Sequence, residues 1–133
     1  MKMTGGCYCG ALRYEITAKP VFKAECYCRA CQHIAGGAPQ YFMLVPEEAF
    51  LFSRGTAKSF TLPDKDNAVT RSFCDICGTH LVTKRPGLEG VIVKVGTLDD
   101  PAQFGRPRAA IFVAEKQPFH QISEDLPQFQ GLP

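Results

Sequence analysis

The sequence predicts an all-β fold that is mainly antiparallel, with several short sheets and one or two short helical turns. Strand-like runs recur about every eight to twelve residues with Gly or Pro between them, which is typical of an all-β domain. Apolar and polar residues alternate in several of these runs, as they do in strands with one buried face. Because 133 residues are enough for one buried core, we expect a single domain over residues 1–133.

The first half of the chain contains the clearest strand. Leu12, Tyr14 and Ile16 alternate with polar residues, so one face of this strand is expected to be buried. Residues 29–35 have room for one or two helical turns before a Gly-Gly-Ala-Pro sequence ends them. A single helical turn is expected to begin at Pro46. The strands expected in this half are residues 12–17, 22–26, 40–45 and 50–54.

The second half continues the same pattern. A β-branched run over residues 91–95 is expected to be well buried. Asp99 and Asp100 are expected to cap a tight turn. Residues 120–133 are expected to form a C-terminal tail that lies on the surface. The strands expected in this half are residues 59–62, 69–73, 80–84, 91–95 and 110–113.

The seven cysteines fall into three close-spaced motifs. These motifs are Cys7-x-Cys9, Cys26-x-Cys28-x-x-Cys31 and Cys74-x-x-Cys77. Thiolates grouped in this way are typical ligands of zinc, a tetrahedral ion that accepts sulfur readily. The first and third motifs together provide four sulfurs, which leaves the middle motif with three and no spare cysteine. The sequence therefore divides into one complete four-sulfur set and one three-sulfur set.

The two sets predict two different zinc sites. A closed four-cysteine site is usually structural, whereas three protein ligands with one exchangeable position form the catalytic arrangement. Zinc with three thiolates has a formal charge of about −1, so its bound water is less acidic than water at a three-histidine site. Such a site is better suited to binding a substrate thiol, which loses its proton on binding. We therefore expect one structural zinc, one catalytic zinc and a small thiol as substrate.

Composition narrows the class of protein further. The formal net charge of +2 is too small to indicate a nucleic-acid partner. No segment has the length and apolar character of a signal peptide or a membrane span, so we expect a cytoplasmic protein that does not contact membranes. In that reducing compartment close-spaced cysteines are metal ligands or redox groups more often than disulfides. A disulfide across Cys-x-Cys would also be strained.

The residues around the cysteines add to the pattern. The segments concerned are Gly5-Gly6-Cys7-Tyr8-Cys9-Gly10 with Arg13-Tyr14, then Cys26-x-Cys28-x-x-Cys31, then Phe73-Cys74-x-x-Cys77-Gly78, and finally Gly96-Thr97-Leu98-Asp99-Asp100-Pro101. In this order they resemble the glutathione-dependent formaldehyde-activating family, which has an Mss4-like β fold. The cysteine motifs are specific at these spacings, although Tyr27 stands where many relatives have histidine.

The resemblance implies a metal content and a reaction. The structural zinc would be bound by the cysteines of the first and third motifs, Cys7, Cys9, Cys74 and Cys77. The catalytic zinc would be bound by Cys26, Cys28 and Cys31. The resemblance further implies that glutathione or a similar thiol binds beside the second zinc and condenses with formaldehyde or another aldehyde to S-hydroxymethylglutathione. The implied activity is therefore that of a carbon–sulfur lyase.

Three alternatives are open from the sequence. The chain can be a non-catalytic zinc module that carries glutathione or another thiol, or that binds a macromolecular partner. The three-cysteine set can be a structural site completed by a histidine; His33 lies close to Cys31, and His80 can substitute in the other set. Finally, Cys28 and Cys31 can form a dithiol redox pair, because Arg29 between them would lower a thiol pKa.

Overall fold

The protein is described by a computed structural model that covers residues 2–133 and is mostly β. Its strands are β1 (Met3–Gly6), β2 (Arg13–Ile16), β3 (Phe22–Cys26), β4 (Gln40–Val45), β5 (Phe50–Arg54), β6 (Lys58–Thr61), β7 (Thr70–Phe73), β8 (His80–Lys84), β9 (Val91–Lys94) and β10 (Ala109–Ile111). The helical elements are α1 (Arg29–Ile34) and the short 3₁₀ turns η1 (Glu47–Ala49), η2 (Val95–Thr97), η3 (Pro101–Phe104) and η4 (Val113–Glu115). The all-β prediction is therefore confirmed.

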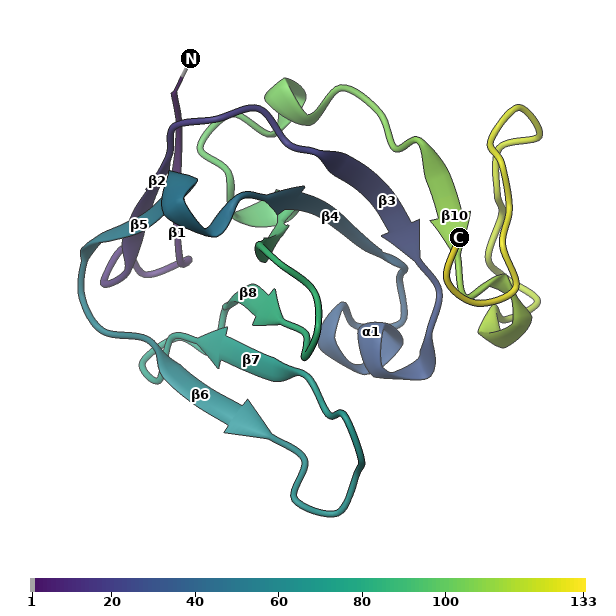
Figure 1. Ribbon diagram of the computed structural model, residues 1–133, viewed down its shortest axis with the longest axis horizontal. Helices are drawn as coiled ribbons and strands as arrows, with labels where there is room; N and C mark the ends of the chain where they lie inside the picture. Colours follow the sequence, from purple (N-terminus) through teal and green to yellow (C-terminus); the bar gives the residue numbers. More distant parts are fainter. Residues whose placement is uncertain (1) are drawn as a thin grey trace.

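The strands form two sheets (Figure 1). The smaller sheet has the order β1-β2-β5, and the larger has the order β10-β3-β4-β9-β8-β7-β6. Paired strands are antiparallel except for β10, which runs parallel to β3. The sequence analysis gave no strand range for β1, because its Gly5-Gly6 end has low strand propensity. Pairing with β2 and a bridge between Gly5 and Leu98 hold β1 in place.

The larger core lies between the two sheets. Tyr14 and Ile16 of β2 pack there with Val45, Leu81 and Val93 of the larger sheet, and all five side chains are buried. Successive residues of a strand point to opposite faces, so Leu44 and Lys94, which neighbour Val45 and Val93, face away from this core. The cysteine motifs at the strand ends are consequently held by two packed sheets.

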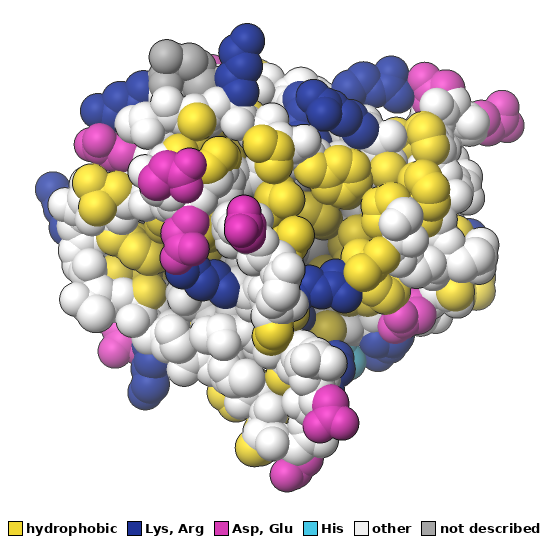
Figure 2. All heavy atoms as spheres, in the orientation of Figure 1, with side chains coloured by type: hydrophobic (Ala, Val, Ile, Leu, Met, Phe, Trp, Pro, Cys, Tyr) yellow, Lys and Arg dark blue, Asp and Glu magenta, His cyan; other side chains and the backbone are white. Residues whose placement is uncertain are grey.

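A second core covers the other face of the larger sheet. Ala24, Phe42 and Ala109 pack there against Cys26 and Cys31, which ties the middle cysteine motif to buried apolar side chains. In Figure 2, hydrophobic side chains also gather on the visible face of the molecule, in the region where β3, β4 and β10 lie in Figure 1. This second core positions α1 beside the end of β3.

The C-terminal residues run alongside β10 (Figure 1). The Ala110 amide donates to the Pro127 carbonyl at 2.9 Å, and the Phe129 amide donates to the Ala110 carbonyl at 2.9 Å. Leu126 is buried against Ala110, so the tail covers the outer edge of the larger sheet through both backbone and side-chain contacts. No helix within residues 2–133 has the length and apolar character needed to cross a membrane.

Asp99 joins the start of the chain to the segment after β9. The Arg13 guanidinium donates to both carboxylate oxygens of Asp99, with one nitrogen–oxygen distance of 2.9 Å, and the Thr4 hydroxyl donates to Asp99 at 2.6 Å. These hydrogen bonds, the one from Arg13 above all, lower the pKa of Asp99 to about 2. Asp100 caps η3 as predicted, because its carboxylate accepts from the Ala102 amide at 3.2 Å. The predicted capping role is wrong for Asp99, which forms this ion pair instead.

At Gly5, the backbone of β1 lies very close to Thr97 and to the Tyr14 side chain. A Cβ atom at Gly5 would lie 2.4 Å from the Thr97 carbonyl oxygen and 2.4 Å from the Tyr14 hydroxyl oxygen. We therefore expect Gly5→Ala to lower the free energy of unfolding by about 1–3 kcal/mol, as overpacking of a filled core does. Gly96→Ala is the matched control, since a Cβ there meets no heavy atom within 4 Å. Urea denaturation measures both, and equal losses would show that the close approach does not govern stability.

Candidate metal centres

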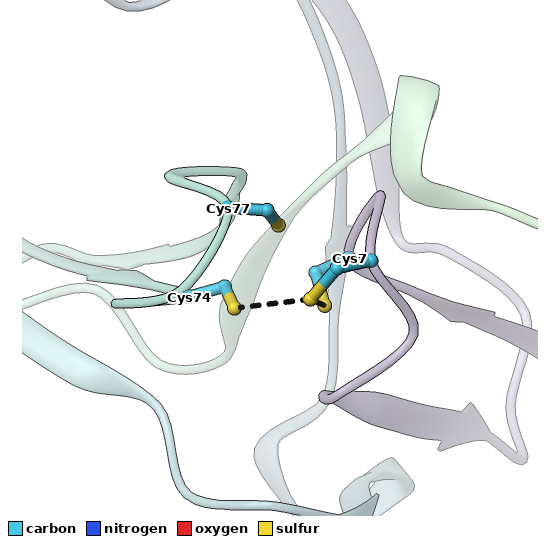
Figure 3. Close-up of side chains that lie close together, drawn as sticks. Cys7, Cys74 and Cys77 are labelled. Atoms are coloured by element: carbon cyan, nitrogen blue, oxygen red, sulfur yellow. Dashed lines mark hydrogen bonds between the residues drawn. The ribbon is translucent and has the colours of Figure 1, made fainter.

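The first and third cysteine motifs meet at one point of the fold. Cys7 and Cys9 follow β1, whereas Cys74 and Cys77 lie in the turn between β7 and β8. The four sulfur atoms all lie within 4.8 Å of one another, with 3.6 Å between Cys7 and Cys9 and 3.8 Å between Cys9 and Cys74. In Figure 3, Cys7 points from its loop toward Cys74 and Cys77. Four sulfurs around one zinc at about 2.3 Å would be about 3.8 Å apart, so the set fits a tetrahedral ion.

Polar groups around this four-cysteine set are arranged to stabilise thiolates. The Leu12 amide donates to the Cys7 sulfur at 3.2 Å. The Thr79 hydroxyl lies 3.2 Å from the Cys77 sulfur, and its hydrogen bond lowers the pKa of Cys77 to about 5. Gly78 has a φ of +80°, the left-handed conformation that closes the turn after Cys77 and that glycine adopts without strain. The donors thus come from the backbone turns that the cysteine spacing creates.

The middle motif forms a separate set of three sulfurs. Cys26 ends β3, Cys28 caps the start of α1 and Cys31 lies within α1. Their sulfur atoms lie within 4.8 Å of one another, and the Cys31 amide donates to the Cys28 sulfur at 3.3 Å. Across residues 2–133, no histidine or carboxylate belongs to this set. The arrangement therefore provides three sulfur donors and no fourth protein ligand.

Neither cysteine set within residues 2–133 includes a histidine, so His33 and His80 do not complete a site, and Arg29 is not among the groups that lower the pKa of Cys28. The His33 ring is exposed and its Nδ1 hydrogen-bonds the Arg29 carbonyl oxygen at 2.8 Å, so it does not complete the three-cysteine set. The Arg29 guanidinium donates to the Gln32 side chain at 2.5 Å. The pKa of Cys28 is lowered to about 2 mainly by hydrogen bonds from Cys26 and Cys31. No disulfide joins the seven cysteines, and the dithiol pair of Cys28 and Cys31, whose sulfurs lie within 4.8 Å of each other, stays a prediction.

Tyr27 and Gln32 fix α1 relative to the rest of the chain. Tyr27 is almost fully buried, donates its hydroxyl hydrogen to Glu25 at 2.6 Å and packs edge-on against the His120 ring at 5.2 Å between centroids. The Gln32 amide donates to the Tyr27 carbonyl at 2.7 Å and to the Glu115 carbonyl at 2.9 Å. The residue between Cys26 and Cys28 therefore has a packing role in this protein.

A cavity of about 280 Å³ lies between the end of α1 and the turn after Cys77, where Gly78 and Thr79 line it, and it contains one residue that the sequence pattern did not single out. Ile34 and Ala35 at the end of α1 line it together with Gln40, His80 and Lys94. The Lys94 side chain is 4% exposed, and burial lowers the pKa of its ammonium to about 8. One signal for it was present: a lysine inside a run of valine and isoleucine that otherwise predicts a buried strand.

Comparison with known proteins gives a family and a fold. Residues 2–115 match the sequence model of the glutathione-dependent formaldehyde-activating enzyme family. The crystal structure of a Rhodobacter sphaeroides protein is similar to this chain with a TM-score of 0.59 and 22% identity. The match covers 79% of this chain and 97% of the Rhodobacter chain, and at this identity it shows the fold alone. The fold is Mss4-like as predicted, and its cysteine sets are suited to binding zinc.

Proposed function

This chain belongs to the glutathione-dependent formaldehyde-activating enzyme family, and from that premise we propose that it is a zinc-dependent carbon–sulfur lyase. In the synthetic direction it would condense glutathione or a similar small thiol with formaldehyde or another aldehyde. The observation that carries this proposal is the division of the seven sulfurs into a set of four and a set of three. Four sulfurs complete the coordination of zinc, whereas three leave one position for a substrate.

The two zinc ions would be held by the two sets. The structural ion would be bound by Cys7, Cys9, Cys74 and Cys77. The catalytic ion would be bound by Cys26, Cys28 and Cys31. Zinc supplies an exchangeable position that favours the thiolate form of a bound thiol. The burial of Cys26 and Cys31 limits water around this position, and the three sulfurs come from one strand end and the helix turn that follows it.

The reaction is an addition to a carbonyl group. The sulfur of the thiol forms a bond to the carbonyl carbon, the π bond of the carbonyl breaks, and the thiol proton ends on the new hydroxyl oxygen. With glutathione and formaldehyde the product is S-hydroxymethylglutathione. Because this addition also proceeds in water, the contribution of the protein is to hold the thiol as a thiolate and to position the aldehyde.

The test is a comparison of rates. We expect adduct formation from glutathione and formaldehyde, followed by exchange NMR, to be faster with saturating protein than in buffer. Elemental analysis should give two zinc ions per chain, and calorimetry should show glutathione binding that depends on the second. An unchanged rate would reject the enzyme, and retained glutathione binding would then identify a thiol carrier.

The setting of the reaction is part of the same proposal. Free glutathione and reduced cysteines are maintained in the cytoplasm, so we propose that the protein acts there. We also propose that residues 1–133 act as one domain, in which residues 120–133 cover an edge of the larger sheet and provide no metal ligand.

A further inference from the structure

Two residues that line the cavity beside Lys94 have a buried polar atom with no hydrogen-bond partner in the protein. Within residues 2–133 three buried side-chain atoms lack a hydrogen bond, and two of them, Gln40 Oε1 and His80 Nδ1, belong to residues that line this cavity. The third, Thr83 Oγ1, belongs to β8, three residues after His80. Buried polar groups in folded proteins are normally hydrogen-bonded. A concentration of unpaired groups in one cavity therefore points to a ligand.

Lys94 adds a buried positive charge to the same cavity. None of the four ion pairs formed within residues 2–133 includes it. The sulfurs of Cys31, Cys26 and Cys28 raise its pKa and the guanidinium of Arg71 lowers it, so its negative neighbours are the sulfurs that would hold zinc, and none is a carboxylate. A buried ammonium without a carboxylate partner is costly, so this position favours an anionic ligand.

Strand register places the cavity next to the three-cysteine set. Gln40 of β4 pairs directly with Cys26 of β3, and Phe42 of β4 pairs directly with Lys94 of β9. Directly paired residues share a face of the sheet, and so do residues two apart along a strand. Cys26, Gln40 and Lys94 therefore lie on one face, with α1 and its Cys31 over the same core.

We propose that this cavity binds the carboxylate of a substrate, with Lys94 as its ion-pair partner. The inference rests on the proposed function, and it narrows the substrates to those that have a carboxylate near the reacting group. At about 280 Å³ the cavity admits a small acid, or one end of a larger thiol such as glutathione. The carboxylate can belong to the thiol or to the aldehyde, because both approach the same three sulfurs.

The three polar residues that line the cavity, Lys94, His80 and Gln40, each have a role in this arrangement. The Lys94 ammonium donates to the carboxylate, and His80 donates a second hydrogen bond from Nδ1 when that nitrogen holds the proton. Gln40 Oε1 accepts from a hydroxyl group, such as the hydroxyl that the addition creates. Lys94 and His80 are thus positioning residues for the substrate, and the three cysteines remain the groups that hold the reacting sulfur.

The experiment compares matched probes by calorimetry on the zinc-loaded protein. Mercaptoacetate and 2-mercaptoethanol are two-carbon thiols that differ in the carboxylate, and glyoxylate and glycolaldehyde form the corresponding aldehyde pair. We expect at least one carboxylate probe to bind about 10- to 100-fold more tightly than its uncharged counterpart, as charge-assisted hydrogen bonds allow. The pair that shows the preference identifies whether the thiol or the aldehyde provides the carboxylate.

Substitutions assign the preference to Lys94. Lys94→Met should remove it, whereas Lys94→Arg should retain most of it because the positive charge is kept. The matched control is Lys84→Met on the neighbouring strand, where the lysine is exposed and paired with Glu47. Lys94→Met is expected to fold, since it replaces a buried unpaired charge with an apolar chain of similar length.

Two results would overturn the inference. The first is equal binding of the charged and uncharged probes in both pairs by the native chain. The second is a loss of zinc from Lys94→Met, which would show that Lys94 balances the charge of the thiolates and does not bind substrate. Both readouts are independent of turnover, so the carboxylate site can fail while catalysis with formaldehyde stands, and it can hold for a protein that only carries a thiol.

Discussion

Cys77→Ser is expected to unfold the protein and to lower its zinc content from two ions per chain to one. Cys77 belongs to the set that joins the loop after β1 to the turn between β7 and β8. Structural zinc contributes about 10–16 kcal/mol of apparent binding free energy in zinc-finger peptides, which is comparable with the entire stability of a small domain. Circular dichroism at 25 °C and elemental analysis measure the two effects on the same sample.

The control for this prediction is the equivalent substitution in the other set. Cys28→Ser is expected to remove the second zinc and to leave a cooperative thermal transition, because two packed cores and the four-cysteine set remain. Comparable unfolding by both substitutions would contradict the division into a structural and a catalytic set. Chelation of both zinc ions from the native chain should reproduce the unfolding seen with Cys77→Ser.

Cys28→Ser is also expected to abolish the acceleration of adduct formation. A bound metal ion contributes several kcal/mol to catalysis, so we expect kcat/KM to fall at least about 100-fold, to the rate measured in buffer. Exchange NMR, which follows formaldehyde between its free and glutathione-bound forms, measures this loss directly. The reason is structural: the Cys28 sulfur lies between β3 and α1, with the sulfurs of Cys26 and Cys31 within 4.8 Å.

His33→Ala is the matched control for the activity measurement. His33 lies on α1 close to Cys31, but its ring is exposed and hydrogen-bonds the backbone of Arg29. Its substitution is expected to change kcat/KM less than about twofold, in keeping with the small effect of surface changes. A loss comparable with that of Cys28→Ser would mean that His33 contributes to the site after all.

Much of the fold was predictable because its signals are local. The strand 22–26 and the helical turns after residue 29 have almost the predicted bounds, since strand periodicity and a Gly-Gly-Ala-Pro stop operate within a few residues. The division of the cysteines was predictable for the same reason, because metal ligands at short spacing need no knowledge of distant contacts.

The features of the fold that the sequence did not predict depend on contacts between residues far apart in the chain. The strand β1 has weak propensity and exists because Gly5 fits closely against Tyr14 and Thr97. Asp99 resembled a turn cap, and its ion pair with Arg13 spans 86 residues. Lys94 looked like one polar position in a valine-rich strand. Its burial follows from the packing of β4 and α1 around β9, which no local pattern records.

The sequence distance between Cys9 and Cys74, which is 65 residues, also sets the order in which the protein can mature on the ribosome. Translation proceeds at about 5–20 residues per second, so the first two thiols wait roughly 3–13 s for their partners to be synthesised. Until then the nascent hairpin of β1 and β2 lacks two of the four sulfurs, and β8, β9 and β10 of the larger sheet are not yet made. Insertion of a metal ion into the four-cysteine set would consequently be a late step of biosynthesis.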